Sequence, residues 1–165
     1  MAELWDIYDI NRNKTGKFCE RDMQPLKECE FHLVVHGWIL NNEGEILLCQ
    51  RASDRKFPLM WEGIGGSVLA GETSIQGMIR EIEEEIGLIV DEKNAILLHT
   101  ETRPKFHDIY DVWLFKTNIA IDDLKFNDGE TINAKWVTKE EFDNMLEANE
   151  IVYTLTYFKA MYYEV

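Results

Sequence analysis

The stretch TSIQGMIREIEEEIGL, residues 73–88, decides the fold because it is the clearest helix in the chain. An apolar side chain recurs at helical spacing, which predicts one face that must be buried. This stripe consists of Ile75, Ile79, Ile82 and Ile86. Thr73 can cap the first turn together with Gln76, and Gly87 suits the left-handed residue that ends a helix. We therefore predict a helix over residues 73–86.

A second face of this helix is acidic. Glu81, Glu84 and Glu85 follow i, i+3, i+4 spacing, with only Arg80 beside them. Each like-charge pair costs about a few tenths of a kcal/mol on an isolated helix. The face is therefore either a solvated acidic surface or a site for a hard divalent cation, which prefers carboxylate oxygens. Gly77 lies one turn earlier, where a glycine suits close approach to the helix backbone.

The composition limits the classes of partner. The 165 residues carry a net charge of −14, so no basic face is expected for a nucleic acid polymer. Three cysteines, Cys19, Cys29 and Cys49, have no metal-type spacing, and their odd number favours reduced thiols in a cytoplasmic protein. No apolar run reaches the roughly 18 residues of a membrane helix, so no membrane partner is expected.

The remaining pattern mixes strands and helices. Runs rich in β-formers predict strands at 5–10, 31–40, 45–50, 96–102, 109–118 and 134–138, with a glycine-rich segment at 61–66 and a polar turn at 11–16. Two further helices are expected at 139–148 and 153–163. Hairpins outnumber βαβ units, which favours an α+β sandwich whose helices cover a mixed β-sheet. Residues 1–165 are expected to form one domain, with 1–30 as an N-terminal strand and turn extension.

The helix belongs to a longer motif that carries a resemblance. From Gly66 to Leu88 the sequence reads Gly-x5-Glu-x7-Arg-Glu-Ile-x-Glu-Glu-x-Gly-Leu. This resembles a complete Nudix box, and the order of strands resembles the α/β/α sandwich of that family. The resemblance implies hydrolysis, by metal-activated water, of the P–O–P bond in a nucleoside or other diphosphate linked to another moiety. It also implies Mg²⁺ or Mn²⁺ as cofactor.

The resemblance also implies roles for residues of the box. The implied metal ligands are Glu81, Glu84, Glu85 and the carbonyl of Gly66. Glu84 or Glu81 would be the general base, although some members of the family use a distant loop, for which Glu130 is the candidate here. Arg80 and Glu72 would hold the loop and the helix in register.

The substrate is less well marked. Four cations could bind phosphate in this acidic chain, or could equally be solvated surface charges: Arg51, Lys56, Arg103 and Lys105. Residues 5–9 and 30–36 resemble a branch akin to isopentenyl diphosphate isomerase, so an isomerase is one alternative. A non-catalytic diphosphate-binding module is the other, although the complete box argues against it. The isomerases of that branch are known for a cysteine just before the box and for a histidine-rich metal site, but residues 61–67 contain neither cysteine nor histidine.

A homodimer is also expected. The hairpin at 31–50 and the aromatic tail offer more apolar surface than a domain of this size readily covers.

Overall fold

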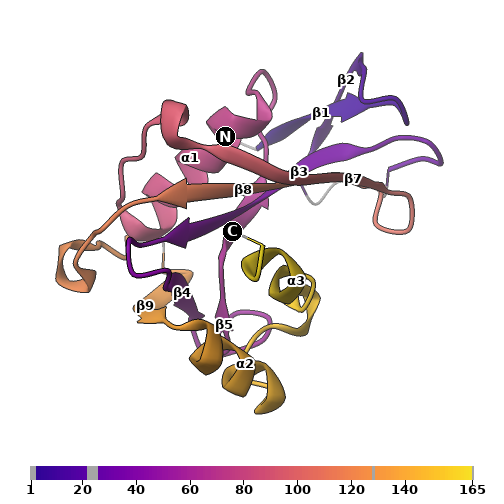
Figure 1. Cartoon of the computed structure of the whole chain (residues 1–165). Helices are drawn as coiled ribbons and strands as arrows, with labels where there is room; N and C mark the ends of the chain where they lie inside the picture. The colour runs from indigo at the N-terminus through magenta and orange to yellow at the C-terminus, as the bar shows by residue number, and fades with distance from the viewer. Residues whose placement is uncertain (1–2, 22–25, 128, 165) are drawn as a thin grey trace.

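The computed structural model describes residues 3–21, 26–127 and 129–164. A mixed sheet has the strand order β5-β4-β3-β8-β7, with β6 paired to β3 and β9 paired to β4 (Figure 1). Its strands are β3 (His32–Leu40), β4 (Ile46–Arg51), β5 (Trp61–Glu62), β6 (Ile64–Ser67), β7 (Ile96–Arg103), β8 (Asp108–Lys116) and β9 (Thr131–Val137). Only the β3–β8 pair among them is parallel. The α+β fold with a mixed sheet is therefore confirmed.

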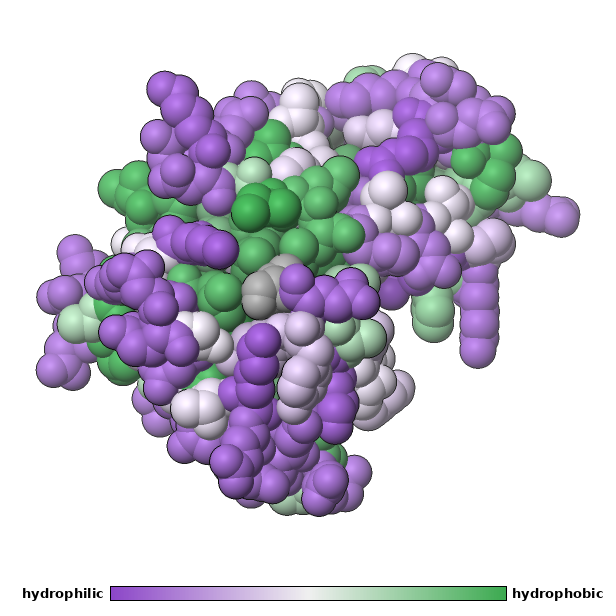
Figure 2. Space-filling view, viewed as in Figure 1, coloured by the Kyte–Doolittle hydropathy of each residue, from purple (hydrophilic) through white to green (hydrophobic). Residues whose placement is uncertain are grey.

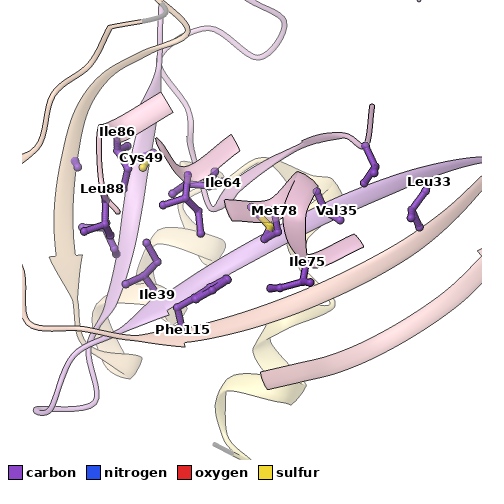
Figure 3. Close-up of a cluster of buried hydrophobic side chains, with 14 of the residues drawn as sticks. Leu33, Val35, Ile39, Cys49, Ile64, Ile75, Met78, Ile86, Leu88 and Phe115 are labelled. Carbon is purple, nitrogen blue, oxygen red and sulfur yellow. The ribbon is translucent and has the colours of Figure 1, made fainter. Parts of the chain in front are cut away.

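Helices cover both faces of this sheet. Alternate residues of β3 point to opposite faces: Leu33, Val35 and Ile39 face α1 (Ser74–Ile86), as Figure 3 shows for this cluster. Trp38 lies on the other face and is fully buried. There it stacks on Phe158 with 3.6 Å between ring centroids. That face is covered by α2 (Lys139–Glu147), η3 (Tyr153–Leu155) and α3 (Phe158–Tyr162). Two short 3-10 helices, η1 (Glu92–Asn94) and η2 (Ile121–Asp123), lie before β7 and after β8.

Helix α1 follows the sequence prediction closely. Thr73 and Gln76 form both hydrogen bonds of a capping box, and Gly87 ends the helix at φ 66°. Of the predicted stripe, three isoleucines are buried and Ile79 is partly buried. Gly77 does allow a close approach, because a Cβ there would lie 2.8 Å from Cγ2 of Val68. The group that approaches the helix at Gly77 is thus the side chain of Val68.

The N-terminal residues form a separate two-stranded sheet. It consists of β1 (Leu4–Tyr8) and β2 (Lys14–Glu20), which pair antiparallel. The prediction of a polar turn over 11–16 was wrong in extent, because β2 already begins at Lys14. Most side chains of β2 are exposed, so the strand lacks the alternation of buried residues that reveals a strand in a sequence.

The apolar residues expected at a dimer interface are buried within the chain. Leu40, Ile46 and Leu48 of the 31–50 hairpin lie in the core with Phe158 and Tyr162 of the tail. Most apolar side chains of the hairpin and the tail are therefore used in the core, although Tyr153 and Tyr163 of the tail stay exposed. Figure 2 shows hydrophobic surface over β7 and β8 instead, where Ile96 and Leu97 of the edge strand are about half exposed.

Two smaller sequence predictions concern the cysteines and the membrane. No disulfide joins the three cysteines, of which Cys49 is buried and Cys29 exposed. Within the described ranges, no helix is long and apolar enough to span a bilayer.

Candidate active site

An open pocket of about 720 Å³ lies along the acidic face of α1. Its walls come from β6, from α1, from the N-terminal hairpin and from the loop before β9. Among the described residues, six glutamates and two arginines line it: Glu3, Glu81, Glu83, Glu84, Glu85, Glu130, Arg21 and Arg80. The predicted box residues are therefore brought together, in a pocket with an excess of negative charge.

Arg80 organises the carboxylates around it. Its Nε and Nη2 donate to Glu72 at 2.8 and 3.1 Å, which ties the helix to the preceding loop. Its Nη1 donates to Glu81 and to Glu84, each at 2.9 Å. The second Nη2 hydrogen bond, 3.0 Å long, goes to the carbonyl of Ser67 in β6. All five N–H groups of the guanidinium are thus engaged.

Glu81 lies directly against the glycine loop. A Cβ at Gly66 would collide with the Glu81 carboxylate, so only glycine leaves room for this side chain. Burial raises the pKa of Glu81, Arg80 opposes that rise, and the charges of Glu84 and Glu3 add to it. The position of this carboxylate therefore depends on the missing side chain at residue 66.

Glu84 and Glu85 differ in their surroundings. The Glu84 side chain is 56% exposed and accepts a hydrogen bond from Arg80. Glu85 is only 8% exposed. Its carboxylate accepts from the Gly65 amide and from the Thr131 hydroxyl, both at 3.3 Å. Glu85 therefore links α1 to β6 and β9, whereas Glu84 faces the open pocket.

The carboxylate oxygens on this face are suitable ligands for a hard divalent cation, but their positions in the structure are not those of a formed metal site. Among the described residues, no three side chains of His, Cys, Asp or Glu already stand at metal-binding spacing. Instead Glu81 and Glu84 are closed onto Arg80. Carboxylate oxygens are nevertheless the ligands that Mg²⁺ and Mn²⁺ prefer, and the space above Gly66 admits the Glu81 carboxylate. The acidic face can therefore hold a cation after a change of side-chain rotamers.

The predicted loop base, Glu130, lines the same pocket. It forms an ion pair with Arg55 at 3.2 Å, and both side chains are well exposed. Two of the predicted phosphate-binding residues lie near this end but do not line the pocket. Arg51 pairs with Glu62 and donates to the carbonyl of Lys56.

The other two predicted phosphate-binding residues lie elsewhere. Arg103, at the end of β7, makes two hydrogen bonds to Asp108, and its guanidinium lies 3.9 Å from the ring centroid of Tyr110. Lys105 lies in the loop that follows, with Nζ 5.8 Å from the ring centroid of Phe106. Neither contributes to the pocket at α1. Their position therefore gives no support to a role in binding phosphate there.

Two residues of the N-terminal segment were missed by sequence reasoning. Glu3 and Arg21 line the pocket from the two ends of the β1–β2 hairpin. Neither belongs to the box, and a single charge next to an exposed strand has no periodic pattern that would reveal it. Asn127, in the loop before β9, was missed for the same reason.

A buried histidine behind the glycine loop was also missed. Tyr157 lies 2.6 Å from His36 Nδ1, and it also contacts the hydroxyl of Tyr110 at 2.9 Å. Trp38 Nε1 donates to the same Tyr157 oxygen at 3.3 Å. Burial lowers the pKa of His36 to about 3, although a hydrogen bond with the Gly63 backbone opposes the shift. The neutral ring therefore connects the C-terminal segment to the loop that precedes Gly66.

The buried neutral ring predicts loss of stability in acid. An unfolded chain protonates His36 near pH 6.5, whereas the folded chain does so at about 3. This contribution to stability is therefore complete above about pH 6.5 and declines as the pH falls towards 3, by about 2 kcal/mol between pH 7 and 5. Urea unfolding at several pH values should show this slope. His36→Gln should flatten it, whereas His99→Gln, at a side chain 41% exposed, should not.

Part of the slope should remain in the His36 variant. Burial also lowers the pKa of His32, so protonation of this second ring in acid also lowers the stability of the folded chain. An unchanged slope in His36→Gln would contradict the assignment of a neutral buried ring at residue 36.

Comparisons with known proteins agree with this geometry. The protein-family model described as "NUDIX domain" matches residues 30–156. A Nudix hydrolase of Listeria monocytogenes, lmo0368, is 34% identical over 155 residues, which cover 91% of this chain and 88% of the relative. Nucleoside triphosphatase NudI of Enterobacter sp. is 35% identical over 122 residues, which cover 68% of this chain and 85% of that protein.

Solved structures show the same fold. DR0079 of Deinococcus radiodurans superposes with a TM-score of 0.72 at 20% identity, over 91% of this chain and 92% of that one. The NUDIX domain of NrtR from Shewanella oneidensis, solved with ADP ribose, gives a TM-score of 0.57 at 16% identity, over 75% and 82% of the two chains. At these identities the likeness shows the fold alone. The match of the family model over residues 30–156 and the 34% identical relative of Listeria establish that this chain belongs to the Nudix hydrolases, a family of diphosphohydrolases.

Proposed function

We propose that this chain hydrolyses the P–O–P bond of a nucleoside diphosphate linked to a further moiety, with Mg²⁺ or Mn²⁺ at the acidic face of α1. The excess of glutamates over arginines in the pocket carries this proposal. A diphosphate is itself an anion, so it can enter such a pocket only with cations that neutralise the charge. The nucleoside triphosphatase activity named for the Enterobacter relative is consistent with this substrate class.

The proposed cation site consists of residues of the box. Glu81, Glu84, Glu85 and the carbonyl of Gly66 would supply its oxygen ligands. A divalent cation bound there supplies positive charge to phosphate oxygens and lowers the pKa of a bound water.

The chain's own groups position and accept protons. Arg80 holds Glu81 beside Gly66 and keeps the loop in register through Glu72. Glu84 faces the pocket with an exposed carboxylate and is our first choice for the group that accepts the proton of the attacking water. The alternative base is Glu130, which lines the pocket from the loop before β9.

Among the described residues that line this pocket there is no cysteine or histidine to act as the acid of an isomerase. Cys49, the nearest cysteine before the box, is 1% exposed and packs in the core beneath α1. His36 lies behind the loop, but its ring is neutral and is held by Tyr157 and by the Gly63 backbone. Within the described part of the chain, the cysteine or histidine donor for proton transfer to carbon is therefore missing from the pocket. The complete set of box carboxylates likewise supports catalysis over a module that only binds diphosphate.

A panel of substrates tests the proposed function. Nucleoside triphosphates, nucleoside diphosphates linked to sugars, and isopentenyl diphosphate should be assayed for phosphate release and for isomerisation, with Mg²⁺, with Mn²⁺ and in chelator. We expect hydrolysis of at least one nucleoside compound, its loss in chelator and no isomerisation. Titration calorimetry with Mn²⁺ gives a readout that is independent of turnover. Full hydrolysis in chelator, or isomerisation that Cys49→Ala abolishes, would overturn the proposal.

Two further expectations stay predictions: the cytoplasmic location and the homodimer. For the dimer, the half-exposed Ile96 and Leu97 on the edge strand β7 offer a further apolar surface.

A further inference from the structure

A cationic side chain can bind a phosphate group in this acidic pocket in addition to the proposed metal ion. Arg80 holds the loop in place, because its Nε and Nη2 donate to Glu72 and to the Ser67 carbonyl, and these three hydrogen bonds do not involve the proposed metal ligands. Its Nη1 is engaged by Glu81 and Glu84 in this structure. Among the described residues that line the pocket, the other cation is Arg21.

Arg21 is carried by a hairpin that is fixed to the rest of the chain. The Ala70 amide donates to the carbonyl of Leu4 at 2.7 Å, and the Gly71 amide donates to the carboxylate of Asp6 at 2.8 Å. Both amides belong to the loop of the Nudix box. At the turn of the hairpin, Arg12 makes two hydrogen bonds, 2.9 and 2.8 Å long, to the buried carboxylate of Asp111. The hairpin therefore has a defined position relative to the box.

The Arg21 side chain forms an ion pair with Glu3 that an anionic ligand can replace. Its Nη1 lies 2.8 Å from Glu3 Oε2, and the Arg21 amide donates to the Glu3 carbonyl at 2.9 Å. Both side chains of this ion pair are about half exposed. Exposed pairs contribute little free energy, so exchange of one anion for another costs little. Glu3 also lies near enough to Glu81 for its charge to help raise the pKa of that carboxyl.

We propose that Arg21 binds a phosphate group of the substrate, and that Glu3 is the counter-ion which this phosphate displaces. The inference rests on the proposed function, because it assigns a phosphate contact within the same pocket. Arginine suits the role, since its planar donors match phosphate oxygens in pairs. Residues 3 and 21 lie outside the matched family region, so this contact is supplied by the N-terminal hairpin of this chain.

Replacement of Arg21 and replacement of Glu3 should have opposite effects on the binding of phosphate. Arg21→Gln should weaken binding of phosphate by about tenfold or more, as expected for loss of a hydrogen bond to a charged group. In turnover the change should appear in KM, with kcat much less affected, because Arg21 lies away from the proposed base. Glu3→Gln should strengthen binding by a few fold, because Arg21 then loses its competing anion. Arg21→Lys should recover part of the affinity.

A variant in the same hairpin provides the control. Lys17 forms an exposed ion pair with Glu30 at 2.7 Å and does not line the pocket. Lys17→Gln therefore removes one positive charge and one ion pair from the hairpin, as Arg21→Gln does. We expect it to leave binding and turnover unchanged.

Calorimetry on the full chain with imidodiphosphate and Mg²⁺ measures the effect without turnover. Wild-type binding that Arg21→Gln weakens and Lys17→Gln does not would support the proposal. Equal affinity of wild type and Arg21→Gln, or equal weakening by both variants, would refute the contact. If wild type instead binds no imidodiphosphate at any Mg²⁺ concentration and hydrolyses nothing in the panel, the proposed function itself fails.

Discussion

Glu84→Gln is expected to lower kcat by at least about a hundredfold while the protein stays folded. The amide keeps the shape of the side chain but cannot accept a proton and is a weaker ligand for a cation. A positioned acid–base group contributes about 10² to 10⁴ in rate. The fold should tolerate the change, because the Glu84 side chain is 56% exposed and its ion pair with Arg80 is an i,i+4 surface pair.

The measurement is steady-state kinetics on whichever panel compound is hydrolysed, with thermal unfolding in parallel. Glu140→Gln, at an exposed glutamate of α2, controls for the loss of one negative charge. Wild-type kcat in Glu84→Gln would move the base to Glu130, where Glu130→Gln should then show the large loss. A large drop in the unfolding temperature would mean that Glu84 has a structural role instead.

Local pattern was enough to predict much of this architecture. The isoleucine stripe, the capping box and Gly87 each favour the same helix, and the structure contains α1 within one residue of the predicted bounds. Agreement between local signals is what makes such an element predictable. Strand β3 was likewise visible, because it is buried on both faces and reads as a continuous run of β-formers.

The parts of the site that depend on long-range contacts were not predictable. The box residues are brought together within 23 positions of sequence, but Arg21 reaches the pocket only because the β1–β2 hairpin is held by Ala70 and Gly71. His36 reads as part of an apolar strand, and nothing near it in sequence predicts Tyr157 as its partner. Charge alone also does not indicate that Arg103 lies away from the pocket at α1, paired with Asp108 across the β7–β8 turn.

Replacement of Gly65 and of Gly66, the first residue of the box, by alanine should have different effects. Neither has a positive φ, so the backbone conformation itself accepts alanine at both positions. At Gly66 the new methyl group would meet the carboxylate of Glu81, the far end of a flexible side chain. At Gly65 it would lie 2.9 Å from the carbonyl oxygen of Val35 and 2.8 Å from the ring of His36.

The neighbour that has to move decides the result. In Gly66→Ala, Glu81 can swing away at little cost to stability, but it then leaves the position that Arg80 holds. A displacement of about 1 Å at a catalytic site can cost about a hundredfold in rate, so kcat should fall by that order with the unfolding temperature nearly unchanged. In Gly65→Ala, the obstacle is the backbone of β3, which cannot move without disturbing the sheet. Stability should fall by about 1–3 kcal/mol, as for other overpacked sites.

Urea unfolding and kcat measured on both variants separate these outcomes. Loss of stability in Gly66→Ala comparable to that in Gly65→Ala would mean that Glu81 is not free to leave. In that case residue 66 is a glycine for packing, and the carboxylate beside it is held by the fold. Retention of both stability and kcat in Gly66→Ala would show that catalysis does not need Glu81 where it lies, and would remove it from the proposed cation site. Only loss of rate with the fold intact fits a glycine kept to make room for a working carboxylate.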